Sequence, residues 1–191
     1  MIGERYTDLA QEYFSFRETV NLGKGGSRIT RHTQNEDDKY GMIDRLDTIP
    51  WDTDVLCVFG GTNDFGGNVK IGSIDSYDYT DFKFCVNEII KTVLSVYPNI
   101  KMYFITPIHR NDWLPDNTPN GAGHTLKDYV DTIKEVCEMY GIPVLDLWSI
   151  YGISPHIESQ KNMFMPDGLH PIPIAMKRLA ELNNKFIENM F

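Results

Sequence analysis

The sequence predicts an α/β fold, a three-layer α/β/α sandwich with a central parallel sheet. Four short apolar runs alternate along the chain with four longer segments in which apolar residues recur at helical spacing. The run 55–59 is apolar at every position, which is typical of a strand covered on both faces of a parallel sheet. With 191 residues, of which 41% are hydrophobic, the chain has enough apolar material for a single domain over 1–191.

The expected strands are the four runs without a helical period: 19–22, 54–59, 101–106 and 143–147. The expected helices are the four segments with apolar residues at i, i+3, i+4 and i+7: 6–14, 86–97, 126–140 and 175–186. Pro98 ends the second of these helices and Gly141 ends the third. The long irregular connections 70–79 and 109–123 border strand ends, where open α/β sheets place their sites, so both are candidate functional loops.

Charge and composition exclude several classes of partner. The 18 Lys and Arg residues face 27 Asp and Glu residues, a net charge of −9, whereas nucleic-acid binding needs clustered basic side chains. No stretch approaches the roughly 18 consecutive apolar residues of a membrane span, and Glu4 and Arg5 interrupt any signal peptide. The three cysteines lie far apart within apolar runs, which is typical of buried reduced thiols. If the sequence is complete as given, a cytoplasmic protein is expected, although an upstream segment would carry any targeting signal.

Two motifs follow the first two expected strands. The glycine-rich turn 23–27 could bring backbone N–H groups together around an anion, but a plain tight turn is the more common explanation of such a motif. Arg28 stands at the third glycine of the dinucleotide pattern, and no Lys-Ser/Thr pair completes a phosphate loop. After the second strand, Asn63 could donate a side-chain N–H to a developing oxyanion, although an Asn that caps a turn is more common.

A third motif, 166–171, precedes the last expected helix and contains Asp167 and His170. At this spacing the carboxylate can hold one ring nitrogen of the imidazole and leave the other free as a general base for a hydroxyl nucleophile. A surface Asp-Gly turn followed by a chance histidine is the alternative explanation. No group of His, Cys, Asp and Glu has metal-ligand spacing, so no metal is predicted.

Taken together, the glycine turn, Gly61-Thr62-Asn63-Asp64 and Asp167-Gly168-Leu169-His170-Pro171 resemble the SGNH (GDSL-like) hydrolase family over nearly the whole chain. The resemblance implies the flavodoxin-like SGNH hydrolase fold and Ser-His-Asp hydrolysis of a small-molecule or carbohydrate ester, without a cofactor. It implies that His170 is the general base and that Asp167 orients it. It further implies an oxyanion hole formed by the backbone N–H of Gly26 and the side chain of Asn63.

The family's Gly-Asp-Ser block, which supplies the nucleophile, does not occur in this sequence. Ser27 is the serine nearest to the expected site, beside Gly26, but it lacks that context. In the family the nucleophile strand lies between the strands that lead to Gly26 and to Asn63, so its absence would open a gap of about 9.6 Å, two strand spacings. Either an upstream segment fills this gap, or the two strands pair directly, or another chain or segment fills it.

Three functions therefore remain open. The leading hypothesis is a serine ester hydrolase, a carbohydrate O-acetyl or short-acyl esterase, whose serine lies upstream of residue 1. The alternative is a catalytically inactive SGNH-fold module that binds an acylated or carbohydrate ligand. The third is an unrelated flavodoxin-like protein that binds a phosphorylated ligand at 23–27.

Overall fold

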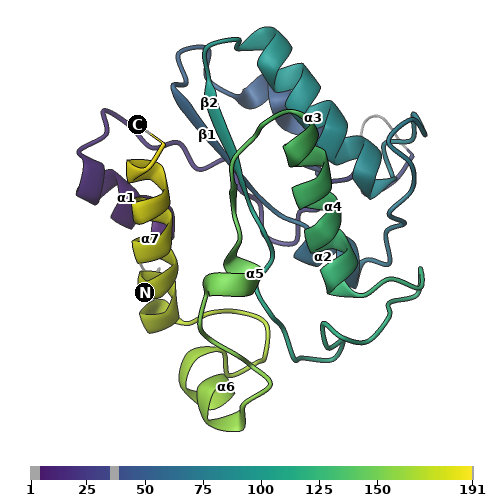
Figure 1. The fold of residues 1–191 in the computed structure, drawn as a ribbon, viewed down its shortest axis with the longest axis vertical. Coiled ribbons are helices and arrows are strands. Elements are labelled where there is room, and N and C mark those ends of the chain that lie inside the picture. Colours follow the sequence, from purple (N-terminus) through teal and green to yellow (C-terminus); the bar gives the residue numbers. More distant parts are fainter. Residues whose placement is uncertain (1–4, 35–38, 191) are drawn as a thin grey trace. The chain divides into compact units, whose positions relative to one another are not determined.

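The computed structural model describes residues 5–34 and 39–190. These residues form two compact units, which are described in turn. Of the described residues, the first unit comprises 5–21, 108–115 and 147–190, and the second comprises 22–34, 39–107 and 116–146. Parallel strands combined with helices confirm the predicted α/β class (Figure 1). The single domain over 1–191 stays a prediction.

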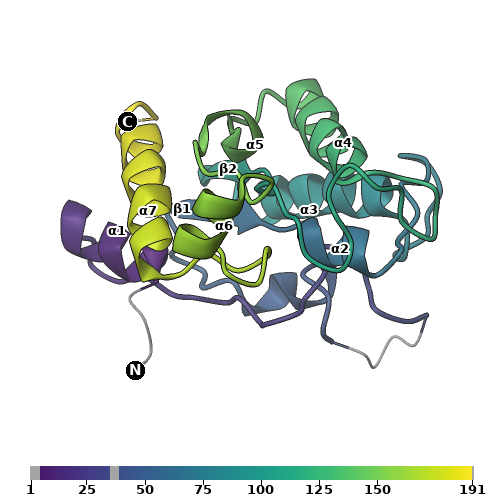
Figure 2. The same cartoon turned by 90° about the horizontal axis from the view of Figure 1, so that it is seen from below.

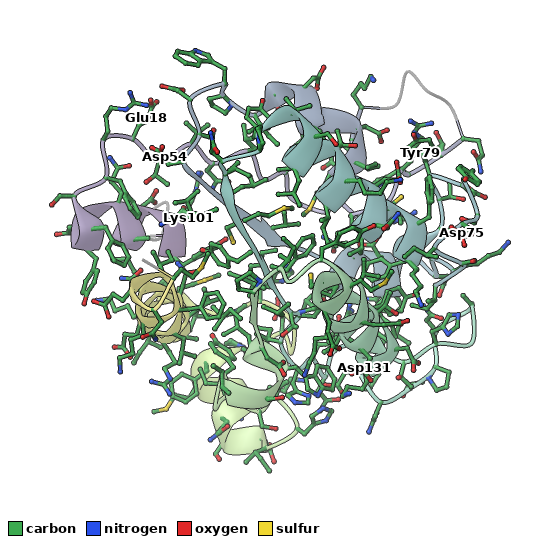
Figure 3. All side chains as sticks on the ribbon, turned by 45° about the horizontal axis from the view of Figure 1, so that its top comes forward. Glu18, Asp54, Asp75, Tyr79, Lys101 and Asp131 are labelled. Atoms are coloured by element: carbon green, nitrogen blue, oxygen red, sulfur yellow. The ribbon has the colours of Figure 1, made fainter. Side chains whose placement is uncertain are left out.

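The second unit contains the sheet, in which β1 (Val55–Phe59), β2 (Lys101–Ile105) and β3 (Val144–Leu145) lie side by side in that order. All three are parallel, and Val55 is paired with Lys101 at one end of the first ladder. At that end the N–H of Lys101 donates to the carbonyl of Asp54 over 2.9 Å, and Figure 3 labels both residues. The central strand β2 buries every residue except Lys101, as predicted for a covered parallel strand. A three-layer sandwich is consistent with this sheet.

Two expected strands differ from the structure. The prediction of a strand over 19–22 is wrong, because these residues adopt no regular secondary structure. A strand forms only by pairing with a neighbour, and no strand in the described part of the chain offers 19–22 a ladder. The strand expected over 143–147 shrinks to β3, because Leu147 already begins the short helix α5 (Leu147–Ile150).

The described part of the second unit contains the helical elements η1 (Ile43–Thr48), α2 (Thr62–Gly66), α3 (Phe82–Val96) and α4 (Leu126–Met139). The helices α3 and α4 confirm the periodicity of 86–97 and 126–140 and pack against each other. A capping box between Thr125 and Asp128 starts α4. The structure also confirms that 70–79 is irregular.

The first unit contains α5 together with α1 (Tyr6–Phe14), α6 (Glu158–Phe164) and α7 (Pro173–Glu188). The helix α1 packs against α7, as both views show (Figure 2), and the Tyr13 hydroxyl donates to Glu188 over 2.6 Å. Both helices confirm the predicted segments 6–14 and 175–186. A membrane span needs a longer and more apolar helix than any in the described part of the chain.

Candidate active site

The first unit brings Asp167 and His170 together as predicted. Nδ1 of the His170 ring lies 2.7 Å from Oδ2 of Asp167. The other carboxylate oxygen, Oδ1, accepts the backbone N–H groups of Leu169 at 2.8 Å and His170 at 2.7 Å. Desolvation acts to raise the pKa of Asp167, but the donors from His170 and Leu169 outweigh it and lower the pKa to about 2. The carboxylate is therefore charged at neutral pH, and it holds the exposed ring by Nδ1 and leaves Nε2 for chemistry.

The turn that carries this pair is built around Gly168. Its φ of +78° belongs to the left-handed region, and a Cβ at this position would lie 2.2 Å from the carbonyl oxygen of Asn111. A hydrogen bond also joins the two segments, since the N–H of Asn111 donates to the carbonyl of Gly168 over 2.8 Å. Lys161 in α6 donates from Nζ to the carbonyl of Asn111 over 2.7 Å. The backbone of 108–115 thus fixes the turn from one side.

A buried ion pair stiffens the segment 108–115. Arg110 donates from Nε to Oδ1 of Asp112 over 2.9 Å and from Nη2 to Oδ2 over 2.6 Å, and the two side chains are only 3% and 7% exposed. The indole of Trp113, with 73% of the residue exposed, lies 5.7 Å from the Arg110 guanidinium. The irregular connection predicted at 109–123 therefore begins with an ordered, charge-paired segment.

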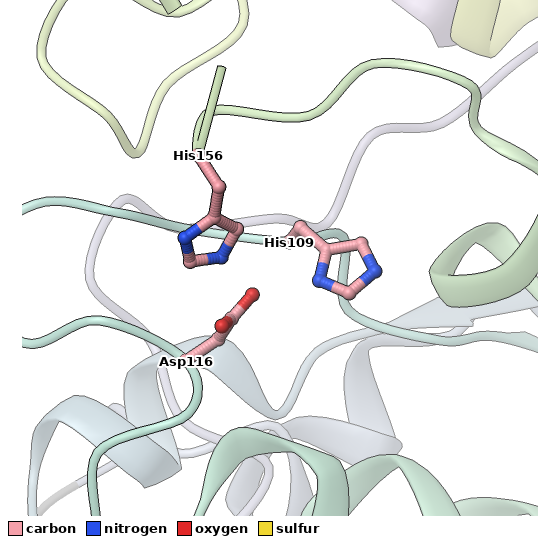
Figure 4. A group of neighbouring side chains, drawn as sticks. All are labelled: His109, Asp116 and His156. Carbon is pink, nitrogen blue, oxygen red and sulfur yellow. The ribbon is translucent and has the colours of Figure 1, made fainter. Parts of the chain in front are cut away.

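Two further histidines of the first unit lie near each other (Figure 4). The ring of His109 lies 3.8 Å from that of Trp148 and 6.1 Å from that of His156, measured between centroids. The prediction of no metal and no cofactor stays a prediction. Asp116, also labelled in Figure 4, belongs to the second unit, where its carbonyl accepts the N–H of Leu126 at the start of α4.

In the second unit the structure brings the glycine turn next to Asn63. Gly26 has a φ of +74°, and within the described residues its backbone N–H has no hydrogen-bond acceptor. The side-chain amide of Asn63 donates from Nδ2 to the carbonyl of Ser27 over 2.9 Å. One of the two amide protons of Asn63 anchors the side chain beside the turn. The other proton and the N–H of Gly26 are thus both available to a negatively charged oxygen.

The hydroxyl of Ser27 serves the packing of this turn. The residue is 2% exposed, and its Oγ donates to the carbonyl of Tyr40 over 2.8 Å. The same oxygen accepts Nη2 of Arg45 over 2.9 Å, and Arg45 also donates from Nε to Gly41. An oxygen engaged in this way has no proton free for a base, which argues against Ser27 as a replacement nucleophile.

One polar residue that the sequence did not single out, Asp64, contacts the backbone that follows the glycine turn. The residue is fully buried and accepts the N–H of Ile29 at 2.9 Å, the N–H of Thr30 at 3.0 Å and the hydroxyl of Thr30 at 2.9 Å. Burial raises the pKa of this carboxyl above its ordinary value, against the opposing effect of these donors. The Gly-Thr-Asn-Asp motif contains Asp64, but a sequence pattern does not distinguish a buried carboxylate from one that caps a helix in water.

The structure thus shows a contact of Asp167 with His170 in the first unit and a contact of Asn63 with Ser27, the residue after Gly26, in the second. That His170 faces the Gly26–Asn63 pair stays a prediction. Also in the second unit, the Arg31 guanidinium lies over the ring of Tyr79, 4.6 Å from its centroid, and Figure 3 labels Tyr79.

Comparison with known proteins gives a family match. The model of the GDSL-like Lipase/Acylhydrolase family matches residues 3–178, whereas no curated protein matches the chain. One crystal structure is 33% identical with a TM-score of 0.88, and the match covers 97% of this chain and 85% of that one. A protein from Lactobacillus plantarum is 27% identical with a TM-score of 0.85, covering 98% and 88% of the two chains. A possible lipase from Chitinophaga pinensis, 18% identical with a TM-score of 0.73 over 97% and 88% of the chains, shares the fold.

Proposed function

Because the chain belongs to the GDSL-like lipase/acylhydrolase family, we propose that it carries the acid–base pair and the oxyanion hole of a serine ester hydrolase. Family membership supports an esterase or acylhydrolase. The observation that carries the finer proposal is the 2.7 Å contact between Asp167 and Nδ1 of His170. A ring held at Nδ1 by a charged carboxylate presents Nε2 as a base and stabilises the imidazolium that forms when it takes a proton.

The nucleophile in this proposal is a serine outside residues 1–191. Among the described strands β1 lies at one edge of the sheet and pairs with β2 alone, so a further parallel strand could extend the sheet beside it. A Gly-Asp-Ser block at the end of such a strand would follow the family pattern. The commitment of the Ser27 hydroxyl to Tyr40 and Arg45 supports an external serine.

The reaction divides the roles as follows. Nε2 of His170 takes the serine proton while the serine oxygen attacks the ester carbonyl. The negative oxygen of the tetrahedral intermediate accepts the N–H of Gly26 and the free side-chain N–H of Asn63. His170 then gives its proton to the departing alcohol and later activates water to release the acid. The substrate in this proposal is a small ester, either an O-acetylated carbohydrate or a short-acyl ester.

The second candidate is a catalytically inactive module that binds an acylated or carbohydrate ligand. The observation that favours it is that no serine of the sequence has a Gly-Asp-Ser context. In that case the Gly26 and Asn63 donors would hold an ester or acetyl carbonyl without attacking it.

Hydrolysis of p-nitrophenyl acetate separates the two. The assay compares two chains, the full-length natural protein and residues 1–191 alone. Each chain is measured as the wild type and as the variant His170→Ala. His124→Ala is the matched control, because His124 packs against the Tyr129 ring in the second unit, 6.3 Å between centroids. Turnover by the full-length protein that His170→Ala abolishes and His124→Ala preserves supports the hydrolase. Binding of an acetylated sugar without His170-dependent turnover in any form would refute it and favour the binding module.

A further inference from the structure

Asp64 stands out because it is a fully buried carboxylate to which the proposed reaction gives no role. It lies in the five-residue helix α2, directly after Asn63. A buried carboxylate is costly unless it is hydrogen-bonded, and this one accepts three donors. All three donors come from Ile29 and Thr30, which follow the glycine turn in the chain. The carboxylate is therefore a link between α2 and the segment that carries Gly26.

The link acts together with Asn63 at the other end of the same segment. Nδ2 of Asn63 bonds the carbonyl of Ser27 at 2.9 Å, whereas the carboxylate of Asp64 bonds the N–H groups of Ile29 and Thr30 at 2.9 and 3.0 Å. Adjacent residues of one helix thus hold both ends of 27–30. Gly60, just before α2, packs so closely on Ile29 that a Cβ would lie 2.8 Å from its Cγ1. These contacts hold the backbone that directly follows Gly26.

We propose that Asp64 is a positioning residue that sets the spacing between the two oxyanion donors, Gly26 and Asn63. The inference rests on the proposed function, since it assigns a role within the same oxyanion hole. Asp64 touches no reacting atom and acts through the backbone of 27–30. Catalysis is sensitive to such positioning, because a misplacement of about 1 Å in a catalytic group costs on the order of 10²-fold in rate.

The variant Asp64→Asn tests the link with almost no change in volume. One carboxylate oxygen becomes an NH₂ group, which faces a backbone N–H of Ile29 or Thr30 and repels it. We expect kcat for p-nitrophenyl acetate in the full-length protein to fall by about 10- to 100-fold with little change in KM. In a background that already lacks the Asn63 amide, Asn63→Ala, the same change should cost far less, because one of the two donors it aligns is gone.

A milder pair of variants keeps the test valid if Asp64→Asn does not fold. Thr30→Val removes only the hydroxyl donor to Asp64 and should lower kcat by about 2- to 5-fold. Thr132→Val is the matched control, because Thr132 is a buried threonine of the same unit whose hydroxyl bonds the carbonyl of Asp128 in α4. It loses an equivalent hydroxyl and should leave kcat unchanged. An unchanged kcat in Thr30→Val, or a loss as large in Thr132→Val, overturns the inference.

A second readout separates failure of this inference from failure of the proposed function. If the full-length wild-type protein hydrolyses no ester, the hydrolase proposal fails, and NMR of the backbone amide of Gly26 and the side-chain amide of Asn63 tests the positioning. Thr30→Val, and Asp64→Asn where it folds, should shift both signals, whereas Thr132→Val should not. Signals that stay at their wild-type positions in both Asp64 and Thr30 variants would show that Asp64 does not set the spacing.

Discussion

Replacing Gly168 by alanine perturbs the acid–base turn at its tightest contact. The added Cβ would lie 2.2 Å from the Asn111 carbonyl oxygen, 2.6 Å from its carbon and 3.0 Å from the Asp112 nitrogen, all backbone atoms. The φ of +78° adds a left-handed strain of about 1–2 kcal/mol for a residue with a Cβ. If the turn moves away from Asn111 to relieve this clash, the hydrogen bond from the Asn111 N–H to the carbonyl of residue 168, 2.8 Å long, is also lost. Such a bond is worth about 0.5–1.5 kcal/mol. The free energy of unfolding should therefore fall by about 2–3 kcal/mol.

Gly152→Ala is the matched control, since it isolates the strain from the contact. Gly152 lies in the same unit with a φ of +73°, but its added Cβ meets only the carbonyl oxygen of Ile150 at 3.9 Å, an ordinary contact. Urea unfolding should give a loss of about 1–2 kcal/mol for Gly152→Ala and a larger loss for Gly168→Ala. In the ester assay Gly168→Ala should also lower kcat, because the turn carries His170, and Gly152→Ala should not. Equal losses of stability and equal kcat values for the two variants would refute the role assigned to the Asn111 contact.

Three further predictions concern single groups. Asn63→Ala should lower kcat by about 10²- to 10³-fold with little change in KM, the usual result of losing an oxyanion donor, and steady-state kinetics with p-nitrophenyl acetate measures it. Between the ordinary pKa of 3.8 and the folded value of about 2, the folded state holds fewer protons on Asp167 than the unfolded state. Its contribution to stability is therefore complete above pH 3.8 and is lost as the pH falls toward 2. An NMR titration of the Asp167 carboxyl carbon in the folded protein measures the lowered pKa on which this depends. Asp112→Ala leaves the buried Arg110 guanidinium without its bidentate partner and should cost about 3–5 kcal/mol in urea unfolding, whereas Asp131→Ala, in the exposed pair with Lys127, should cost about 0.5 kcal/mol or less.

The long helices were predictable because each buries one face over several turns. The apolar repeat of 126–140 is local information, and so is the Pro-Asn pair at 98–99 that follows α3. The short elements α2, α5 and α6 were not predicted, because helices of 4 to 7 residues hold two turns at most and show no repeat. The strand predicted over 19–22 failed for a different reason. Its residues suit a strand, but pairing is a property of the neighbours and cannot be read from the segment.

The same distinction divides the site residues. The contact between Asp167 and His170 spans three positions of one turn, so spacing predicted it directly. The contact of Asn63 with the glycine turn joins residues 36 positions apart, and only the family resemblance suggested it. Family membership supports an ester hydrolase. The roles proposed for the site residues (Gly26, Asn63, Asp167 and His170) stay predictions that the kinetic variants test.

Burial decides what the remaining polar residues beside the glycine turn can do. Ser27 has the right chemistry for a nucleophile and the nearest position in the sequence, yet its hydroxyl is enclosed between Tyr40 and Arg45. Asp64 has the right chemistry for a general base, yet it is enclosed by the donors of Ile29 and Thr30 and has no route to a substrate proton. Both residues form hydrogen bonds with the segments next to the proposed oxyanion donors. These contacts support a nucleophile that lies outside the glycine turn in the proposed reaction.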